Sequence, residues 1–150
     1  MKAKTIFPIL LTLATAGAAT SAALAHGGVK NAAVKARMDL MVQIRDATGV
    51  LVSMAKGEAP FKPKQAEQAR ATLEEASGKI VAHFREPAMD AKSESLPAIW
   101  TNWEDFAARS RQLRRVTAEV DTSTLPSLRA GVGQVGRACA ACHEHYRIKK

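Results

Sequence analysis

Two cysteines and a histidine near the C-terminus have residue types and a spacing that point to one kind of chemistry. They form the run Cys139-Ala140-Ala141-Cys142-His143, and they include the only two cysteines of the 150-residue chain. On an α-helix, side chains at positions i and i+3 project from one face, so both thiols can bond the same rigid group. The pattern C-x-x-C-H is typical of haem c attachment, in which the thiols bond the haem and the histidine ligates the iron.

Other interpretations of the cysteine pair stay open at this point. A redox dithiol of the thioredoxin type would follow a β-strand, and the sequence contains no strand pattern. A tetrahedral zinc site needs four ligands, and the local set of Cys139, Cys142, His143 and His145 is crowded and lacks a separated second pair. A disulfide between the two cysteines is the remaining alternative.

The N-terminus has the composition of a secretory signal peptide, which favours haem attachment over those alternatives. Two lysines precede an uncharged apolar run, and Ala23-Leu24-Ala25 provides a small-residue cleavage site. We therefore expect residues 1–25 to be a signal peptide and residues 26–150 to form one mature domain in the periplasm. Retention as an uncleaved membrane anchor is the alternative, although the run is short and rich in alanine and threonine.

Charge and composition narrow the classes of partner. The whole chain carries a net charge of +8 at pH 7, which favours solubility and attraction towards acidic partner surfaces. Aromatic residues make up only 5% of the chain and do not alternate with basic residues, so we expect no nucleic-acid partner. No later segment is apolar over a membrane-spanning length, so we expect no membrane span after signal cleavage.

Four amphipathic segments separated by turn residues predict an all-α fold. The expected helices run from about Asn31 to Met54, from Pro63 to Phe84, from Pro97 to Val120 and from Leu125 to Tyr146. In the last helix, apolar residues and both cysteines alternate at spacings of three and four, which places the cysteines on the inward face. Short connections imply an antiparallel up-down-up-down four-helix bundle with covalently attached haem.

Three glycines in the last helix, Gly131, Gly133 and Gly136, require an explanation because each lowers helix propensity by about 1 kcal/mol relative to alanine. They would allow a haem plane or a neighbouring helix to approach closely. Tolerance of small residues without any such contact is an equally good explanation.

The first expected helix supplies candidates for the other side of the iron. On a helical wheel, Met41 lies well inside the apolar face, whereas Met38 and Met54 lie on its flanks. Met41 is therefore the best-placed sixth ligand, although a methionine that merely fills the core would have the same position. Arg37 falls in the middle of this face, where a haem propionate would provide the anion that a buried arginine needs. A surface arginine that extends its head group to water is the alternative.

With the C-x-x-C-H motif at the end of the last of four helices, the chain resembles the class II c-type cytochromes. This family comprises cytochrome c′ and its low-spin soluble relatives. The matching pieces are the segment 139–147, the turn 56–61 and the segment 96–100, which opens the third helix. The resemblance implies one covalently attached haem c and places Arg147 beside the proximal histidine. It also places Arg37 on the family's first-helix arginine and Met41 on the distal side of the haem.

The family divides at the distal position, and the resemblance therefore implies two alternative functions. In the low-spin members a first-helix methionine ligates the iron, and the protein transfers electrons. In cytochrome c′ the iron is five-coordinate and binds nitric oxide or carbon monoxide. Because of Met41, we expect single-electron transfer with His143 and Met41 as iron ligands, and gas binding is the alternative. We expect no enzymatic activity of the peroxidase type, since the first-helix face offers no distal acid–base group.

The expected partners are redox proteins whose identity the residues do not indicate. Basic side chains on the third expected helix or at the C-terminus could dock such a partner, although an ordinary solvated face is the simpler interpretation: Arg109, Arg111, Arg114, Arg115, Lys149 and Lys150. The resemblance also implies a homodimer, because family members often pair through their first two helices.

Overall fold

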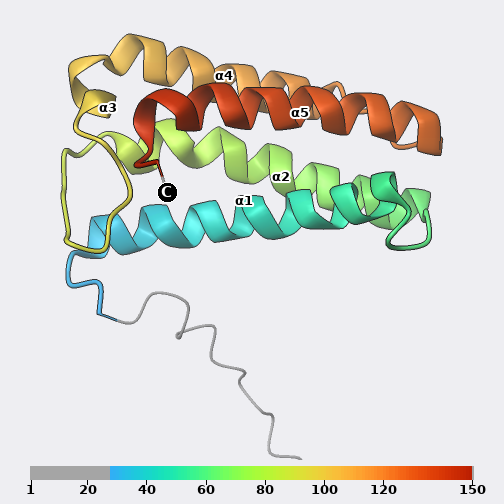
Figure 1. Ribbon diagram of the computed structural model, residues 1–150, viewed down its shortest axis with the longest axis horizontal. Coiled ribbons are helices and arrows are strands. Elements are labelled where there is room, and N and C mark those ends of the chain that lie inside the picture. Colours follow the sequence, from blue (N-terminus) through green and yellow to red (C-terminus); the bar gives the residue numbers. More distant parts are fainter. Residues whose placement is uncertain (1–27, 150) are drawn as a thin grey trace, which may run out of the picture.

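The computed structural model describes residues 28–149, and within this range it contains five helices and no β-strand (Figure 1). The helices are α1 (Ala32–Lys56), α2 (Pro63–Phe84), α3 (Ala98–Thr101), α4 (Trp103–Ala118) and α5 (Leu125–Tyr146). The expected signal peptide, residues 1–25, lies outside the described residues. None of the described helices is long and apolar enough to cross a membrane.

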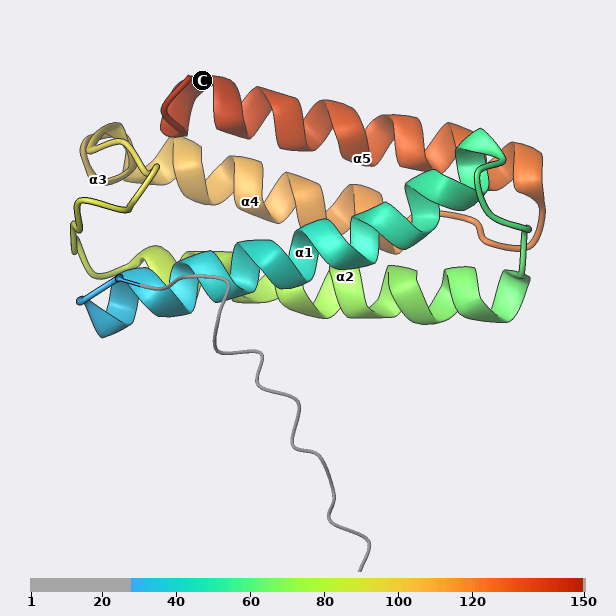
Figure 2. The same cartoon turned by 60° about the horizontal axis from the view of Figure 1, so that its bottom comes forward.

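The four long helices form an antiparallel bundle, and this confirms the predicted architecture (Figures 1 and 2). α1 packs against α2 and α5, and α4 packs against the same two helices, so α1 and α4 lie diagonally opposite. The centre is filled by side chains that are at most 1% exposed: Leu51, Leu73, Ile99, Leu128 and Val135. Burial of each such side chain contributes about 1.5–3 kcal/mol.

Local chemistry explains where the helices begin and end. The Asn31 side chain accepts hydrogen bonds from the first backbone N–H groups of α1, and Gly57 ends this helix with a φ of 79° that favours glycine. The Thr124 side chain caps α5, and Pro126 lies in its first turn. The bounds predicted for α2 are confirmed, and α1 continues two residues beyond its predicted end at Met54.

The prediction of a single helix from Pro97 to Val120 is wrong in one respect, because the observed helix is interrupted at Asn102. This residue has φ −119° and ψ 43°, outside the helical region, and separates the short α3 from α4. Asparagine favours such breaks since its side chain competes for backbone hydrogen bonds. α4 then ends at Ala118, so Val120 lies in the turn between α4 and α5.

Gly131 allows that turn to pack closely on α5. A Cβ at this position would lie 2.9 Å from Cγ1 and 3.2 Å from Cα of Val120, closer than non-bonded carbon atoms normally approach. At Gly133 the nearest atom to such a Cβ would be 3.7 Å away, and at Gly136 none of the described atoms lies within 4 Å. A close approach therefore occurs at Gly131, but the neighbour is the α4–α5 turn and not the haem plane or helix that we expected.

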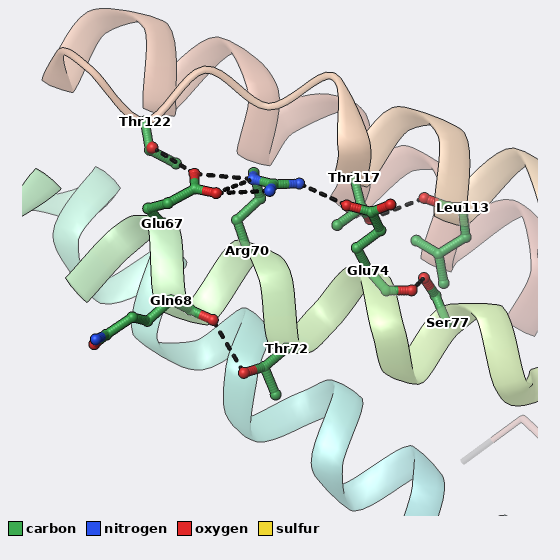
Figure 3. Close-up of polar contacts among 9 residues, drawn as sticks. All are labelled: Glu67, Gln68, Arg70, Thr72, Glu74, Ser77, Leu113, Thr117 and Thr122. Atoms are coloured by element: carbon green, nitrogen blue, oxygen red, sulfur yellow. Dashed lines mark hydrogen bonds and ion pairs between the residues drawn. The ribbon is translucent and has the colours of Figure 1, made fainter. Parts of the chain in front are cut away.

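A cluster of four side chains, here called the Arg70 cluster, fastens the same turn to α2 (Figure 3). The Arg70 guanidinium lies 2.6 Å from Glu67 Oε1 and 2.8 Å from Glu74 Oε2, all within α2. Thr122, in the α4–α5 turn, donates a hydrogen bond of 2.9 Å to the Glu67 carboxylate. Hydrogen bonding to Arg70 lowers the pKa of Glu67. These charges therefore hold the end of the bundle at which α5 begins.

At the opposite end, the C-terminal tail pairs with the connection between α2 and α3. The backbone N–H of Leu96 donates to the Tyr146 carbonyl at 3.0 Å, and that of Ile148 donates to the Glu94 carbonyl at 2.8 Å. These bonds flank an isolated antiparallel bridge between Ser95 and Arg147. The pairing fixes the last turn of α5, which begins at His143 of the C-x-x-C-H motif.

Candidate haem site

Both cysteines of the motif lie on α5 with half-buried side chains packed against the hydrophobic core. Both are free thiols, so they do not form the alternative disulfide. Burial raises the pKa of both thiols, that of Cys142 to about 11. Among residues 28–149 there is no group of three or more His, Cys, Asp or Glu side chains that could hold a metal ion by itself, and a zinc site therefore has no support there.

His143 lies at the surface of α5, directly after Cys142. Desolvation lowers the pKa of its imidazole, the positive charge of Arg147 lowers it further, and Glu94 opposes the change. These effects favour the uncharged ring, which is the form that ligates a metal.

Arg147, which the resemblance places beside the proximal histidine, is held by Glu94. Its guanidinium lies 2.6 Å from the Glu94 carboxylate through Nη2 and 2.8 Å through Nε. Glu94 was missed from the sequence, because it lies in a polar connection without helical periodicity. Glu94 is brought to Arg147 by the pairing of this connection with the C-terminal tail.

Arg109 on α4 also contacts the motif, and this contact was likewise missed. Its Nη1 donates a hydrogen bond of 3.1 Å to the carbonyl oxygen of Ala141, which lies between the two cysteines. Its Nε donates to Asp105 Oδ2 at 2.6 Å. The Tyr146 hydroxyl donates to the same carboxylate oxygen at 2.5 Å. An aspartate and an arginine four residues apart were the only sequence signal for this cluster.

On the opposite side, α1 runs antiparallel to α5, and one hydrogen bond indicates how the two helices are aligned. Arg129 Nε, near the start of α5, donates to the carbonyl of Ala55, near the end of α1, at 2.7 Å. His143 lies fourteen residues after Arg129 on α5, and Met41 lies fourteen residues before Ala55 on α1. Because the helices are antiparallel, this count puts His143 and Met41 at the same level to within about one helical turn. Met41 is half-buried and packs against the core. From the Arg129 contact towards the motif, the two helices diverge (Figure 2).

Arg37 is 2% exposed, which confirms the predicted burial and rules out a surface arginine. Its Nε donates to the carbonyl of His83 at 2.9 Å and its Nη1 to that of Ala88 at 2.8 Å, while Nη2 donates to the carbonyl of Glu86. The guanidinium also lies 5.2 Å from the ring centres of Phe84 and Trp100. Main-chain carbonyls therefore satisfy a guanidinium for which we expected an anion, and the propionate contact stays a prediction.

The remaining methionines differ in burial, and two of the remaining histidines have hydrogen-bond partners. Met54, predicted on the flank of the apolar face, is 2% exposed and belongs to the core, whereas Met38 is half-buried and Met89 is 50% exposed. Nδ1 of His83 and Nδ1 of His145 each lie 3.0 Å from a carbonyl oxygen of the preceding helical turn. These contacts give both rings partners within their own helices.

The chemistry of the donor set fits a covalently attached haem. Two free thiols lie one helical turn apart on a half-buried face of α5, and an imidazole follows the second of them. Such a set can form two thioether bonds and supply one axial nitrogen ligand. On α1, Met41 packs against the core, and counting along both helices from the Arg129–Ala55 bond puts it within about one helical turn of the level of His143.

A family model described as Cytochrome C′ matches residues 32–147, which is almost the entire described chain. The protein belongs to the cytochrome c′ family. Members of this family carry covalently bound haem c, so both the recognised family and the predicted cofactor are confirmed. The individual roles of Cys139, Cys142, His143, Met41, Arg37 and Arg147 stay predictions.

Sequence relatives cover nearly the whole domain. Cytochrome c-556 of Agrobacterium tumefaciens (strain apple 185) is 37% identical over 130 residues, which are 84% of this chain and 99% of that protein. Cytochrome c′ of Alcaligenes xylosoxydans xylosoxydans is 30% identical over 122 residues, covering 79% and 94% of the two chains. Both relatives therefore belong with this chain in one family of haem proteins.

Solved structures agree with the fold. Cytochrome c′ from Rhodobacter sphaeroides superposes with a TM-score of 0.73 at 26% identity, over 79% of this chain and 96% of that one. A nitric oxide complex of a cytochrome c′ variant from Alcaligenes xylosoxidans gives a TM-score of 0.70 at 29% identity, over 79% and 94%. A carbon monoxide complex of another variant gives 0.68 at 29% identity, over 78% and 94%.

Proposed function

We propose that this member of the cytochrome c′ family is a periplasmic haem c protein in which Cys139 and Cys142 carry the haem and His143 ligates the iron. The free thiols, their shared half-buried face on α5 and the histidine that directly follows the second of them support this assignment. When bound, the haem supplies an iron centre that can change oxidation state and bind a diatomic gas. The haem would be held from α5, with Met41 and Arg37 of α1 as the predicted residues on its other side.

For the distal side, binding of nitric oxide or carbon monoxide is the function that the comparisons favour. The supporting observation is that similar solved structures are complexes of cytochrome c′ variants with these two gases. In this function the side chain of Met41 borders the distal position without ligating the iron, and the protein binds a ligand rather than catalysing a reaction.

Electron transfer with Met41 as sixth ligand is a second candidate, and one specific observation supports it. The bond from Arg129 to Ala55 aligns α1 and α5 so that Met41 comes to the level of His143. A thioether opposite an imidazole forms the Met/His pair found in electron-transfer cytochromes. In this function both axial positions are filled, and a redox partner docks at the surface.

One set of spectra decides between these functions. If the protein binds gases, its ferric form should be high-spin. Its ferrous form should then bind carbon monoxide with an affinity that Met41→Leu leaves unchanged. Electron transfer predicts a low-spin ferric protein with the absorption band of methionine–iron ligation. Met41→Leu would then remove the band and strengthen carbon monoxide binding about tenfold or more, since the competing ligand is gone. Met38→Leu is the matched control, because Met38 is half-buried one turn away on the same helix.

The attachment itself is tested by trypsin digestion of the holoprotein. Cleavage after Arg137 and Arg147 releases residues 138–147, which contain both cysteines. We expect this peptide to retain the mass of one haem, and a haem-free peptide would overturn the assignment of Cys139 and Cys142.

A groove between α1 and α2, with a volume of about 830 Å³, supports the expected homodimer. Val42, Ala47, Val50 and Ala69 line it together with charged and amide side chains. A second copy would cover this apolar surface. Sedimentation velocity of the holoprotein at several concentrations tests the association.

A further inference from the structure

We propose that Arg109, held by Asp105, is a positioning residue that sets the orientation of the haem-ligating turn of α5. This inference rests on haem attachment at Cys139 and Cys142 with His143 as iron ligand. The bonds that the structure gives Arg109 go to Asp105 and to the carbonyl of Ala141, so it acts on the motif through the main chain. Its hydrogen bond to the Ala141 carbonyl joins α4 to the interior of the motif.

One carboxylate fixes the turn on both sides of His143. Asp105 Oδ2 accepts from Arg109, which reaches Ala141 before the histidine, and from the hydroxyl of Tyr146 after it. Tyr146 is 5% exposed, and its ring packs edge-on against Phe106 of α4, with ring centres 5.3 Å apart. Because the segment between the two attachments is less than two helical turns long, neither end can rotate freely relative to α4.

The surroundings of this cluster distinguish it from an ordinary surface ion pair. An exposed pair of an aspartate and an arginine four residues apart contributes little to stability. Here the same two side chains also bond a different helix, at a main-chain carbonyl and at a buried hydroxyl. A guanidinium at a carbonyl near a helix C-terminus is also favoured by the helix dipole.

The charge of Arg109 is also close enough to affect the attachment site. Its guanidinium bonds the carbonyl of Ala141, the residue directly before Cys142. A positive charge near an iron centre favours its reduced state, and contacts that orient an iron ligand tune the metal. Arg109 therefore has two separable effects, one of charge and one of geometry.

The experiment compares Arg109→Gln, Arg109→Lys and the control Arg111→Gln in the haem-loaded protein. Arg111 is exposed and lies two residues further along α4, so its loss removes the same charge from a different side of the helix. The readouts are the midpoint potential and the amide hydrogen exchange of residues 144–146. Asp105→Asn serves as a second variant if Arg109→Gln does not accumulate as holoprotein.

We expect Arg109→Gln to lower the midpoint potential more than Arg111→Gln does and to accelerate exchange at residues 144–146 about tenfold, the effect of losing a hydrogen bond to a charged group. Arg109→Lys keeps the charge, so its potential should lie closer to that of the wild type than the potential of Arg109→Gln does. Its protection should still be lost, because an ammonium cannot bond Asp105 and Ala141 in the same fork geometry. Equal effects of Arg109→Gln and Arg111→Gln on both readouts would overturn the positioning role. A wild-type protein without haem on residues 138–147 would instead overturn the attachment on which it rests.

Discussion

Arg70, near one end of this bundle, is held differently from Arg37 and Arg109, near the other end. At the end where α5 begins, Arg70 bonds two carboxylates of its own helix, and one of these reaches Thr122 in the adjacent turn (Figure 3). At the motif end, Arg37 and Arg109 donate to main-chain carbonyls of other segments. A carboxylate that loses its arginine can turn to water, whereas a carbonyl in the interior loses a charged donor that water does not readily replace. Stability should therefore depend more on Arg37 than on Arg70.

The largest effect is expected for Arg37→Met, which keeps much of the side-chain volume but removes three hydrogen bonds. The carbonyls of His83, Glu86 and Ala88 would lose their donor, and Phe84 and Trp100 would lose the guanidinium between them. Each lost hydrogen bond from the charged guanidinium costs about 1 kcal/mol or more, so we expect a loss of about 3 kcal/mol in the free energy of unfolding. Urea denaturation of the holoprotein measures it.

The haem spectrum separates this structural role from the predicted propionate contact. If the carbonyl contacts are the main role of Arg37, Arg37→Lys should be nearly as destabilised as Arg37→Met, because lysine cannot reproduce three bonds in a planar fork. Stability close to that of the wild type, with a change confined to the midpoint potential, would contradict the carbonyl role and favour the propionate.

The fold could be predicted because helical periodicity, caps and prolines act locally. The seam of apolar residues and cysteines in α5, the cap at Thr124 and the prolines at the helix starts all correspond to observed features. The break at Asn102 could not be predicted, since the apolar pattern continues through it on both sides. Contacts such as Tyr146 with Asp105 join residues far apart in sequence, and periodicity carries no information about them.

The site residues could be predicted only where they lie close together in the sequence. The motif placed two thiols and an imidazole on one helix, and the wheel correctly placed Arg37 inside the bundle. What Arg37 binds depends on the path of the connection after α2, which has no periodic pattern. The same connection brings Glu94 to Arg147, and this pairing was missed for the same reason.

At the other end of the bundle, close packing should matter more than charge. Gly131→Ala would place a Cβ 2.9 Å from Val120 Cγ1, with the backbone of Val120 directly behind it at 3.2 Å. Overpacking of this kind costs about 1–3 kcal/mol, measured by urea denaturation. Gly49→Ala is the matched control, because a Cβ there meets none of the described atoms within 4 Å. It should be neutral or stabilise α1 by up to about 1 kcal/mol. Equal behaviour of the two variants would contradict the role given to Gly131.

The smallest effect is expected for Arg70→Met, the counterpart of Arg37→Met at this end. Both carboxylates stay accessible to water, with side-chain exposures of 50% for Glu67 and 30% for Glu74, so the loss should be about 1 kcal/mol or less. Arg111→Met, at an exposed position of α4, controls for the change of residue type.

The stability difference between the wild type and Arg70→Met should depend on pH if it comes from the ion pair with Glu67. Arg70 lowers the pKa of Glu67 in the folded protein, so the stabilisation is present above the ordinary pKa of 4.5 and disappears as the pH falls through the lowered value. Wild type and Arg70→Met should therefore differ most near neutral pH and converge in acid. High salt should also reduce the difference, since these charges are partly exposed. A loss as large as that of Arg37→Met, unchanged in acid, would show that stability depends equally on Arg37 and Arg70 and would remove the contrast between them.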